Sequence, residues 1–184
     1  GCKSRNTPFT LVPSDKSGID FSNSLAESDS HNILTSLYYY NGAGVAIADF
    51  NKDGLEDVLF TANENSCKLY LNEAELKFKD ITAPAGLTTD FWATGATVVD
   101  INHDGWPDIY ISAAGYDDPS ERRNRLYVHQ GLDQKGLPSF EEQAEAFGIA
   151  DTGYTTQSVF FDYDRDGFLD LYVCLLYTSP SPRD

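Results

Sequence analysis

Three acidic loops with one common pattern are the part of this 184-residue chain best suited to chemistry. They cover residues 49–57 (loop 1), 100–108 (loop 2) and 162–170 (loop 3). Each loop has oxygen-bearing side chains at positions 1, 3, 5 and 9, and a glycine at position 6 permits a sharp turn. Together with the backbone carbonyl of position 7, these groups form the oxygen shell that a hard cation such as Ca²⁺ prefers.

The pattern predicts up to three Ca²⁺ ions as the cofactors of this chain. The predicted metal ligands are Asp49, Asn51, Asp53, Leu55 and Asp57 in loop 1, Asp100, Asn102, Asp104, Trp106 and Asp108 in loop 2, and Asp162, Asp164, Asp166, Phe168 and Asp170 in loop 3. The alternative is a set of metal-free Asx turns that end hairpins. However, several carboxylates in one turn repel one another unless a cation lies among them. Mg²⁺ fits less well because it demands octahedral geometry.

The residues around the loops distinguish these loops from EF-hands. An EF-hand needs a glutamate at position 12 and a helix on each side, but position 12 is Phe60, Ile111 or Val173 here. Short runs of β-branched and aromatic residues precede and follow each loop, as in residues 45–47 and 58–60. Each loop is therefore predicted to join the two strands of a β-hairpin.

Further strands recur after the first two hairpins, at residues 68–72 and 125–129 and again at 77–82 and 139–142. Four strands in each unit of some fifty to sixty residues are typical of a β-propeller blade. We therefore predict an all-β chain, a β-propeller fragment of about two and a half four-stranded blades with calcium-binding hairpin loops.

The expected organisation follows from these repeats. We expect a lipobox remnant and lead-in segment at residues 1–36, blade 1 at 37–90, blade 2 at 91–152, the first hairpin of a truncated blade 3 at 153–173, and a non-native tail at 174–184. The tail is predicted to be non-native because its sequence resembles a translated sequencing adapter.

These loops, with small residues before them such as residues 42–44, carry a family resemblance. The chain resembles the FG-GAP (VCBS) repeats of integrin α-subunit propellers over about residues 9–173. It resembles still more closely the bacterial, Bacteroidetes-type lipoproteins with FG-GAP repeats, which are related to the cartilage acidic protein (ASPIC/UnbV) family. The resemblance implies a propeller and Ca²⁺ at the ligand positions given above. One departure is Ala48, Val99 or Phe161 before the first aspartate, where many members have glycine.

The resemblance also implies a location. Gly1 and Cys2 resemble the end of a bacterial lipobox, so Cys2 is the predicted lipidation site. We therefore expect an exported protein of the bacterial cell envelope, either an outer-membrane lipoprotein or a cell-surface protein. Contact with the membrane is expected through the lipid anchor only, because no apolar run is long enough to span a bilayer.

The implied function is binding or adhesion, with an unknown protein or glycan as the ligand. No catalytic set and no further cofactor site is recognisable, because His31, His103 and His129 are scattered and no nucleophile lies in a known motif. We therefore predict that the chain is not an enzyme. Two alternatives remain, namely part of a propeller-based carbohydrate-active enzyme and a structural spacer for a missing C-terminal domain.

Charge excludes one class of partner. The net charge is −16 and the sequence pI is about 4.3, to which the ten aspartates of the loops contribute −10. Nucleic acid is not an expected partner, because phosphate binding needs clustered lysine and arginine. Cys67 stands alone at the start of a predicted strand and is expected to be a small buried hydrophobe.

Overall fold

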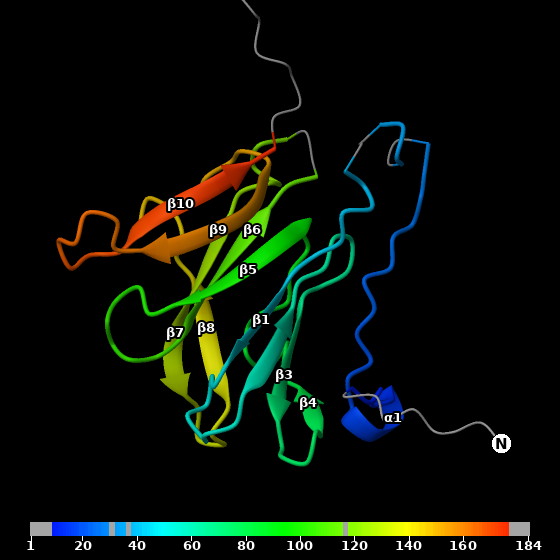
Figure 1. Cartoon of the computed structure of the whole chain (residues 1–184), viewed down its shortest axis with the longest axis vertical. Coiled ribbons are helices and arrows are strands. Elements are labelled where there is room, and N and C mark those ends of the chain that lie inside the picture. The colour runs from blue at the N-terminus through cyan, green and yellow to red at the C-terminus, as the bar shows by residue number, and fades with distance from the viewer. Residues whose placement is uncertain (1–8, 30–31, 36–37, 116–117, 177–184) are drawn as a thin grey trace, which may run out of the picture.

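The computed structural model describes residues 9–29, 32–35, 38–115 and 118–176, and the regular secondary structure of this part of the chain is almost entirely β-strand (Figure 1). Ten strands form three antiparallel sheets, two of four strands and one of two strands. The prediction of an all-β fragment with two and a half four-stranded units is thereby confirmed. The helix α1 (Ser14–Ser17) is a single turn, and no helix of the described residues is long and apolar enough to cross a membrane.

Blade 1 is a four-stranded meander in which each strand pairs with the next one along the chain. Its strands are β1 (Val45–Ala48), β2 (Asp57–Phe60), β3 (Lys68–Asn72) and β4 (Phe78–Asp80). Short β-branched and aromatic runs separated by polar turns favour this arrangement.

Blade 2 repeats the same order with longer strands. They are β5 (Ala93–Val99), β6 (Asp108–Ala113), β7 (Arg125–Leu132) and β8 (Pro138–Glu142). A third hairpin follows, made of β9 (Thr155–Phe161) and β10 (Asp170–Leu175). Strand β10 extends two residues into the predicted tail, since Cys174 pairs with Gln157 and Leu175 with Thr155.

The three acidic loops connect equivalent strands in the same register. The last residue before each loop pairs with the loop's own position 9: Ala48 with Asp57, and Val99 with Asp108. In the third hairpin, the same pairing joins Phe161 and Asp170. Position 9 therefore belongs to the second strand of each hairpin, and its side chain has a direction that the sheet sets.

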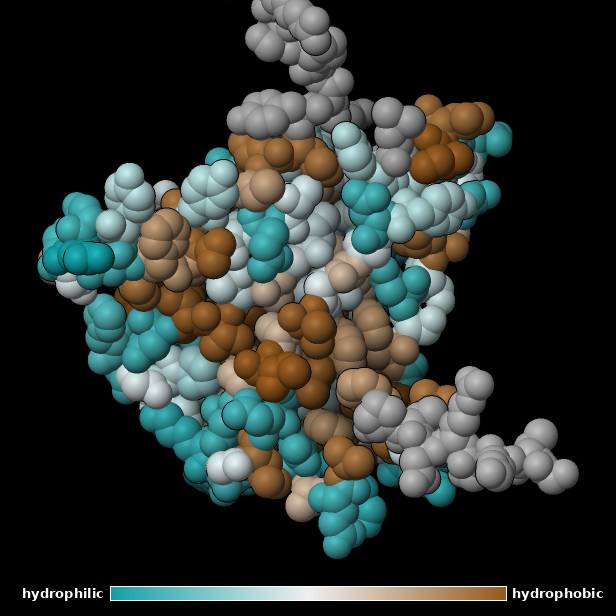
Figure 2. All heavy atoms as spheres, viewed as in Figure 1, coloured by the Kyte–Doolittle hydropathy of each residue, from teal (hydrophilic) through white to brown (hydrophobic). Residues whose placement is uncertain are grey.

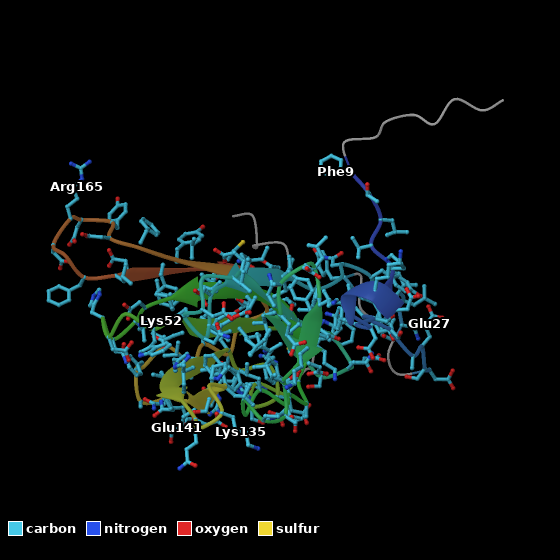
Figure 3. The ribbon with its side chains drawn as sticks, turned by 90° about the horizontal axis from the view of Figure 1, so that it is seen from below. Phe9, Glu27, Lys52, Lys135, Glu141 and Arg165 are labelled. Carbon is cyan, nitrogen blue, oxygen red and sulfur yellow. The ribbon has the colours of Figure 1, made fainter. Side chains whose placement is uncertain are left out.

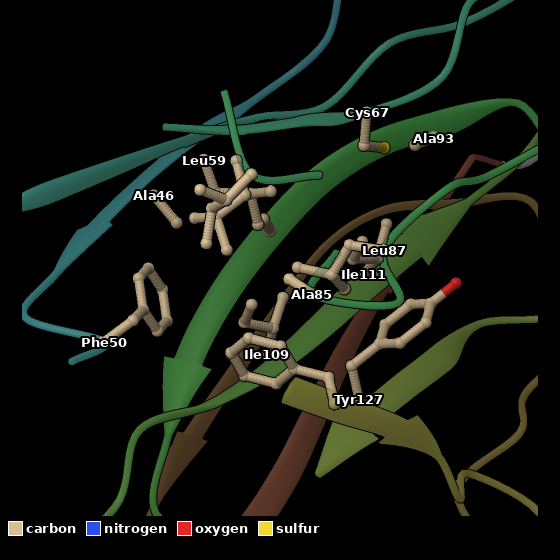
Figure 4. Packing of buried hydrophobic residues seen from close by; sticks show 14 of the residues in the cluster. Ala46, Phe50, Leu59, Cys67, Ala85, Leu87, Ala93, Ile109, Ile111 and Tyr127 are labelled. Atoms are coloured by element: carbon tan, nitrogen blue, oxygen red, sulfur yellow. The ribbon is translucent and has the colours of Figure 1, made fainter. Parts of the chain in front are cut away.

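The main hydrophobic core lies between blades 1 and 2 (Figure 4). Phe50 and Leu59 from blade 1 meet Ile109, Ile111 and Tyr127 from blade 2, and the first four of these side chains are fully buried. Phe50 is position 2 of loop 1, so the loop itself is anchored in the core. Burying a large apolar side chain contributes about 1.5–3 kcal/mol relative to leaving it exposed.

A smaller core joins blade 2 to the third hairpin. Tyr110, Leu126 and Val128 form it with Phe160 and Leu171 packed against them. The rings of Tyr110 and Phe160 meet edge to face, with 5.3 Å between their centroids. Successive blades are thus joined by face-to-face packing of side chains that alternate along each strand.

The lead-in segment covers part of blade 1. The Phe21 ring stacks on Phe60 with 4.9 Å between centroids, and the Tyr70 hydroxyl donates a hydrogen bond of 2.8 Å to Oδ1 of Asp20. These contacts join residues about forty to fifty positions apart in sequence. The described part of the expected lead-in is therefore packed against the first blade.

Apolar surface remains on the outermost strands (Figure 2). Tyr172 of β10 has the position that Leu59 and Tyr110 occupy in the preceding blades, where both are fully buried by the following blade, yet Tyr172 is 60% exposed. Val45 and Ile47 on β1 are likewise more than half exposed. The repeat thus leaves one face open at each end of the described array, as expected for a stack of units.

Gly44 is required where the first strands of blades 1 and 2 approach each other. A methyl group on Gly44 would lie 2.9 Å from Cα of Gly95 and 3.2 Å from the backbone nitrogen of Ala96. We expect Gly44→Ala to lower the free energy of unfolding by about 1–3 kcal/mol, because backbone atoms must move apart. Urea denaturation measures this loss.

The exposed neighbour Val45 supplies a control for the Gly44 substitution. Val45→Ala should change the free energy of unfolding by no more than about 0.5 kcal/mol, as surface substitutions usually do. Equal effects of the two substitutions would show that the approach of the two blades at Gly44 is not tight.

Candidate metal centre

Position 1 of each loop folds the turn around its own carboxylate. In loop 1, Oδ1 of Asp49 accepts a hydrogen bond of 3.1 Å from the backbone N–H of Asp53, and Oδ2 accepts one of 2.8 Å from Gly54. Asp100 and Asp162 make the same two hydrogen bonds in loops 2 and 3. Three separate segments of the sequence thus adopt one conformation.

Positions 3 and 5 continue this arrangement. Oδ1 of Asn51 accepts a hydrogen bond of 3.2 Å from the backbone N–H of Asp53, and Oδ1 of Asp53 accepts one of 2.8 Å from Leu55. The equivalent hydrogen bonds recur in loops 2 and 3. In loop 1 the Asn51 side-chain amide also donates to Oδ2 of Asp53 at 2.9 Å. Side chains from positions 1, 3 and 5 therefore converge on one turn.

The backbone of the loops is bent at two positions. Position 4 has a positive φ in every loop, 57° at Lys52, 57° at His103 and 64° at Arg165, although none of these residues is glycine. Position 6 is a glycine with φ between 82° and 91° in each case. Figure 3 shows Arg165 at the tip of the β9–β10 hairpin, projecting from the body of the molecule. The bends turn the side chains of positions 1, 3 and 5 inward.

Position 9 has a second task that the motif does not reveal. Asp57 is fully buried, and its Oδ2 accepts a hydrogen bond of 2.9 Å from the backbone N–H of Phe50 while Oδ1 accepts one of 2.8 Å from Asn72. Asp108 does the same with Ile101 and His129, at 2.9 and 2.8 Å. Each carboxylate thus joins its loop to the third strand of the blade.

The oxygen positions fit a hard cation. In loop 3, Asp162, Asp164 and Asp166 each place a carboxylate oxygen within 4.8 Å of the other two, and all three residues are exposed. Asp170 lies outside this group, and its Oδ2 accepts a hydrogen bond of 2.8 Å from the backbone N–H of Tyr163. Carboxylates this close repel one another without a cation, and oxygen ligands suit Ca²⁺. Ligation by the fifteen predicted residues remains a prediction.

Burial and hydrogen bonds move the pKa values of these carboxyls in opposite directions. Burial raises the pKa of Asp57 to about 6, and two backbone N–H donors only partly offset that effect. Burial likewise raises the pKa of Asp108. By contrast, the backbone N–H of Trp106 lowers the pKa of the exposed Asp104. In each of the first two loops the buried position 9 holds its proton more tightly than a free aspartate does.

The raised pKa of Asp57 predicts a pH dependence in calcium-free solution. The folded protein binds this proton more tightly than the unfolded chain does. The proton therefore stabilises the folded state fully at a pH below the ordinary aspartate pKa, and this stabilisation is lost as the pH rises through about 6. We expect the stability of wild type to fall more than that of Asp57→Asn between pH 5 and 7, by roughly 1 kcal/mol. His129, whose pKa burial lowers, acts oppositely but equally in both proteins.

Carboxyl-carbon NMR measures the same effect directly. Without calcium, the Asp57 resonance should titrate near pH 6. Added calcium should shift that titration downward if the cation contacts the carboxylate, because a nearby cation favours the ionised form. A titration near pH 4 without calcium would contradict the effect ascribed to burial.

Lys52 and His129 are two residues near the loops that sequence reasoning did not assign to the site. Lys52 Nζ lies 3.8 Å from the centre of the Trp106 ring, and His129 stacks on that ring. No sequence pattern pointed to them, because the Lys52 contact joins two blades and the His129 contact joins a loop to a strand far away in sequence. Cys2, the predicted lipidation site, lies outside the described residues. Cys67 is a free cysteine and is buried, as predicted.

Comparison with known proteins supports the FG-GAP assignment. Residues 49–111 match the FG-GAP-like repeat family, a stretch that runs from the start of loop 1 to β6. Cartilage acidic protein 1 of Mus musculus is 27% identical over 175 residues, covering 92% of this chain and 25% of that protein. Integrin alpha-4 of Xenopus laevis is 29% identical over 150 residues, and integrin alpha-8 of Gallus gallus 34% over 162. Both integrin matches cover 73% of this chain and 14% of the relative.

The chain thus spans a quarter or less of the length of these curated relatives. They also correct one expectation. The predicted location in a bacterial outer membrane is wrong, because these relatives are vertebrate cartilage acidic proteins and integrin alpha chains. That expectation rested on the resemblance to bacterial FG-GAP lipoproteins and on the likeness of Gly1 and Cys2 to the end of a lipobox.

Proposed function

We propose that this chain is a calcium-binding FG-GAP repeat segment of an exported adhesion protein. The observation that carries this proposal is the threefold recurrence of one loop conformation, with the same hydrogen bonds from positions 1, 3 and 5. The matched FG-GAP-like repeat spans the first two of these loops. Similarity to integrin alpha chains supports an adhesion-like role with protein ligands.

Calcium would be held mainly by side-chain oxygens of positions 1, 3 and 5, with the carbonyl of position 7. Position 9 would supply a further carboxylate oxygen, although its hydrogen bonds to the backbone give it a structural role as well. Extracellular calcium-binding modules have Kd values of about 10⁻⁴–10⁻³ M. Sites of that strength stay occupied outside cells and act as structural clamps.

The only buried histidine among the described residues also favours binding over catalysis. His129 is 3% exposed, and both of its ring nitrogens are committed to hydrogen bonds with backbone atoms of Phe50 and Gly131. A general base needs a free nitrogen within reach of a substrate proton. His129 therefore serves the architecture of the blades.

Isothermal titration calorimetry with calcium tests the metal sites. We expect up to three sites in the full chain and none in a variant that carries Asp49→Asn, Asp100→Asn and Asp162→Asn. These substitutions preserve the size of position 1 and remove one charge from each loop. A folded wild-type chain that binds no calcium would contradict the proposal, and circular dichroism establishes that the sample is folded.

Adhesion is tested with the chain immobilised on a sensor surface. Extracellular-matrix proteins and a glycan array are applied in 1 mM calcium and again in chelator. The proposal predicts calcium-dependent binding of a protein and no such binding by the triple asparagine variant. Binding to glycans alone would replace the proposed ligand class with carbohydrate.

A further inference from the structure

Loops 1 and 2 touch through a stack of side chains whose residue types the loop motif does not specify. Lys52, position 4 of loop 1, places its ammonium 3.8 Å from the centre of the Trp106 ring, position 7 of loop 2. The His129 imidazole stacks on the same indole, with 4.5 Å between centroids and 16° between planes. The ammonium and the imidazole thus both lie against the indole. A lysine over tryptophan is a favourable cation–π contact.

Hydrogen bonds fix the imidazole between the two loops. His129 Nδ1 accepts a hydrogen bond of 2.8 Å from the backbone N–H of Gly131, so the proton is on Nε2. Nε2 therefore donates to the backbone carbonyl of Phe50 in loop 1, at 2.9 Å. The backbone N–H of His129 donates a hydrogen bond to Asp108 in loop 2. His129 is thus bound to both loops at once.

We name the set of Phe50, Lys52, Trp106 and His129 the interloop clamp. Two of its members alternate with predicted metal ligands of loop 1, since Phe50 lies between positions 1 and 3 and Lys52 between positions 3 and 5. In loop 2, Trp106 itself provides the position 7 carbonyl. A change in the conformation of one loop must therefore displace side chains that hold the other.

No equivalent clamp joins loops 2 and 3 within the described residues. Phe168 occupies position 7 of loop 3, where it is 72% exposed and has no aromatic or cation contact that corresponds to those of Trp106. His103 occupies position 4 of loop 2, the position that Lys52 occupies in loop 1. The third loop is thus an internal control for the first two.

We propose that loops 1 and 2 form a coupled pair of calcium sites, in which a cation bound to one loop raises the affinity of the other, while loop 3 binds independently. This inference rests on the proposed calcium-binding function. A cation that orders loop 2 fixes the indole, and the indole fixes Lys52 and, through His129, the Phe50 carbonyl. Part of the ordering that loop 1 needs is then already complete when its own cation arrives.

Electrostatics works in the opposite direction. Each of the two loops has three aspartates among its ligands, so a cation in one loop weakens the negative potential at the other. This contribution is reduced by salt, because the Debye length at 0.15 M is about 8 Å. Positive coupling at that ionic strength therefore reports the clamp, and a variant without the clamp should show no coupling or negative coupling.

The test measures calcium affinity of the full chain by calorimetry in 0.15 M salt. Inactivating loop 2 with Asp100→Asn and Asp104→Asn should weaken binding at loop 1 by about fivefold or more. Inactivating loop 1 with Asp49→Asn and Asp53→Asn should weaken loop 2 by the same factor, because coupling is reciprocal. Inactivating loop 3 should leave both affinities unchanged.

Two further variants keep every ligand and break the clamp. Trp106→Leu retains the backbone carbonyl and introduces the residue that loop 1 has at the same position, Leu55. Lys52→Gln removes only the charge over the indole. In both variants, inactivating one loop should change the calcium affinity of the other by much less than fivefold. In a Trp92→Phe background, Trp106 emission should respond to calcium even when only loop 1 can bind it, because Lys52 contacts the ring.

The possible results distinguish a failure of the coupling between loops 1 and 2 from a failure of calcium binding itself. A folded chain that binds no calcium overturns the proposed function. Calcium binding with affinities that do not depend on the neighbouring loop overturns the coupling alone. If a loop-inactivated variant does not fold, the binding curve of Trp106→Leu decides, because its cooperativity must be lower than that of wild type. Equal cooperativity would overturn the clamp.

Discussion

Asp57→Ala should lower the free energy of unfolding by about 3 kcal/mol or more, even with calcium absent. Asp57 is fully buried and accepts hydrogen bonds from the backbone N–H groups of Phe50 and Asn72. Alanine leaves both donors without a partner, and each buried unsatisfied donor costs about 1–3 kcal/mol. The loss of the third strand's attachment to the loop should make this variant one of the most destabilised in the chain.

Asp170 is the matched control for this substitution. It occupies the same position 9 in loop 3, but it is exposed, and among the described residues only the backbone N–H of Tyr163 donates a hydrogen bond to it. Asp170→Ala should therefore cost less than about 1 kcal/mol. Urea denaturation in chelator, followed by circular dichroism, compares the two. Equal losses would show that the two hydrogen bonds by which Asp57 joins the loop to the third strand add nothing to stability.

Removing calcium should be the second large effect. With Kd values of about 10⁻⁴ M and calcium at 1 mM, each occupied loop stabilises the folded state by about 1.4 kcal/mol. Three occupied loops would contribute about 4 kcal/mol, which corresponds to a fall in Tm of about 10 °C for a chain of this size when calcium is chelated. Thermal melts in calcium and in chelator measure the difference.

Two controls distinguish specific binding from a general effect of ions. Magnesium at the same concentration should give a smaller rise in Tm, because it requires octahedral geometry and loses its water reluctantly. The variant with Asp49→Asn, Asp100→Asn and Asp162→Asn should melt at nearly the same temperature with and without calcium. Identical Tm values of wild type in calcium and chelator would reduce the loops to metal-free turns.

The sequence by itself determined the hairpins and their repetition. Glycine at position 6 and the aspartate or asparagine side chains at positions 1, 3 and 5 fold each turn through contacts within nine residues, so the local sequence contains all the necessary information. The β-branched runs beside the loops predicted the strands for the same reason, and β1, β2, β5 and β6 lie where those runs occur. The repeat then predicted the number of blades.

Only the tertiary structure decided how the loops connect to the rest of the molecule. The pattern indicated that Asp57 and Asp108 were ligands, but their hydrogen bonds to Asn72 and His129 depend on where the third strand of each blade lies. The stack of Lys52 on Trp106 depends on how two blades pack. Such contacts join residues far apart in sequence, so no local spacing specifies them. Packing between blades decides which loop touches which.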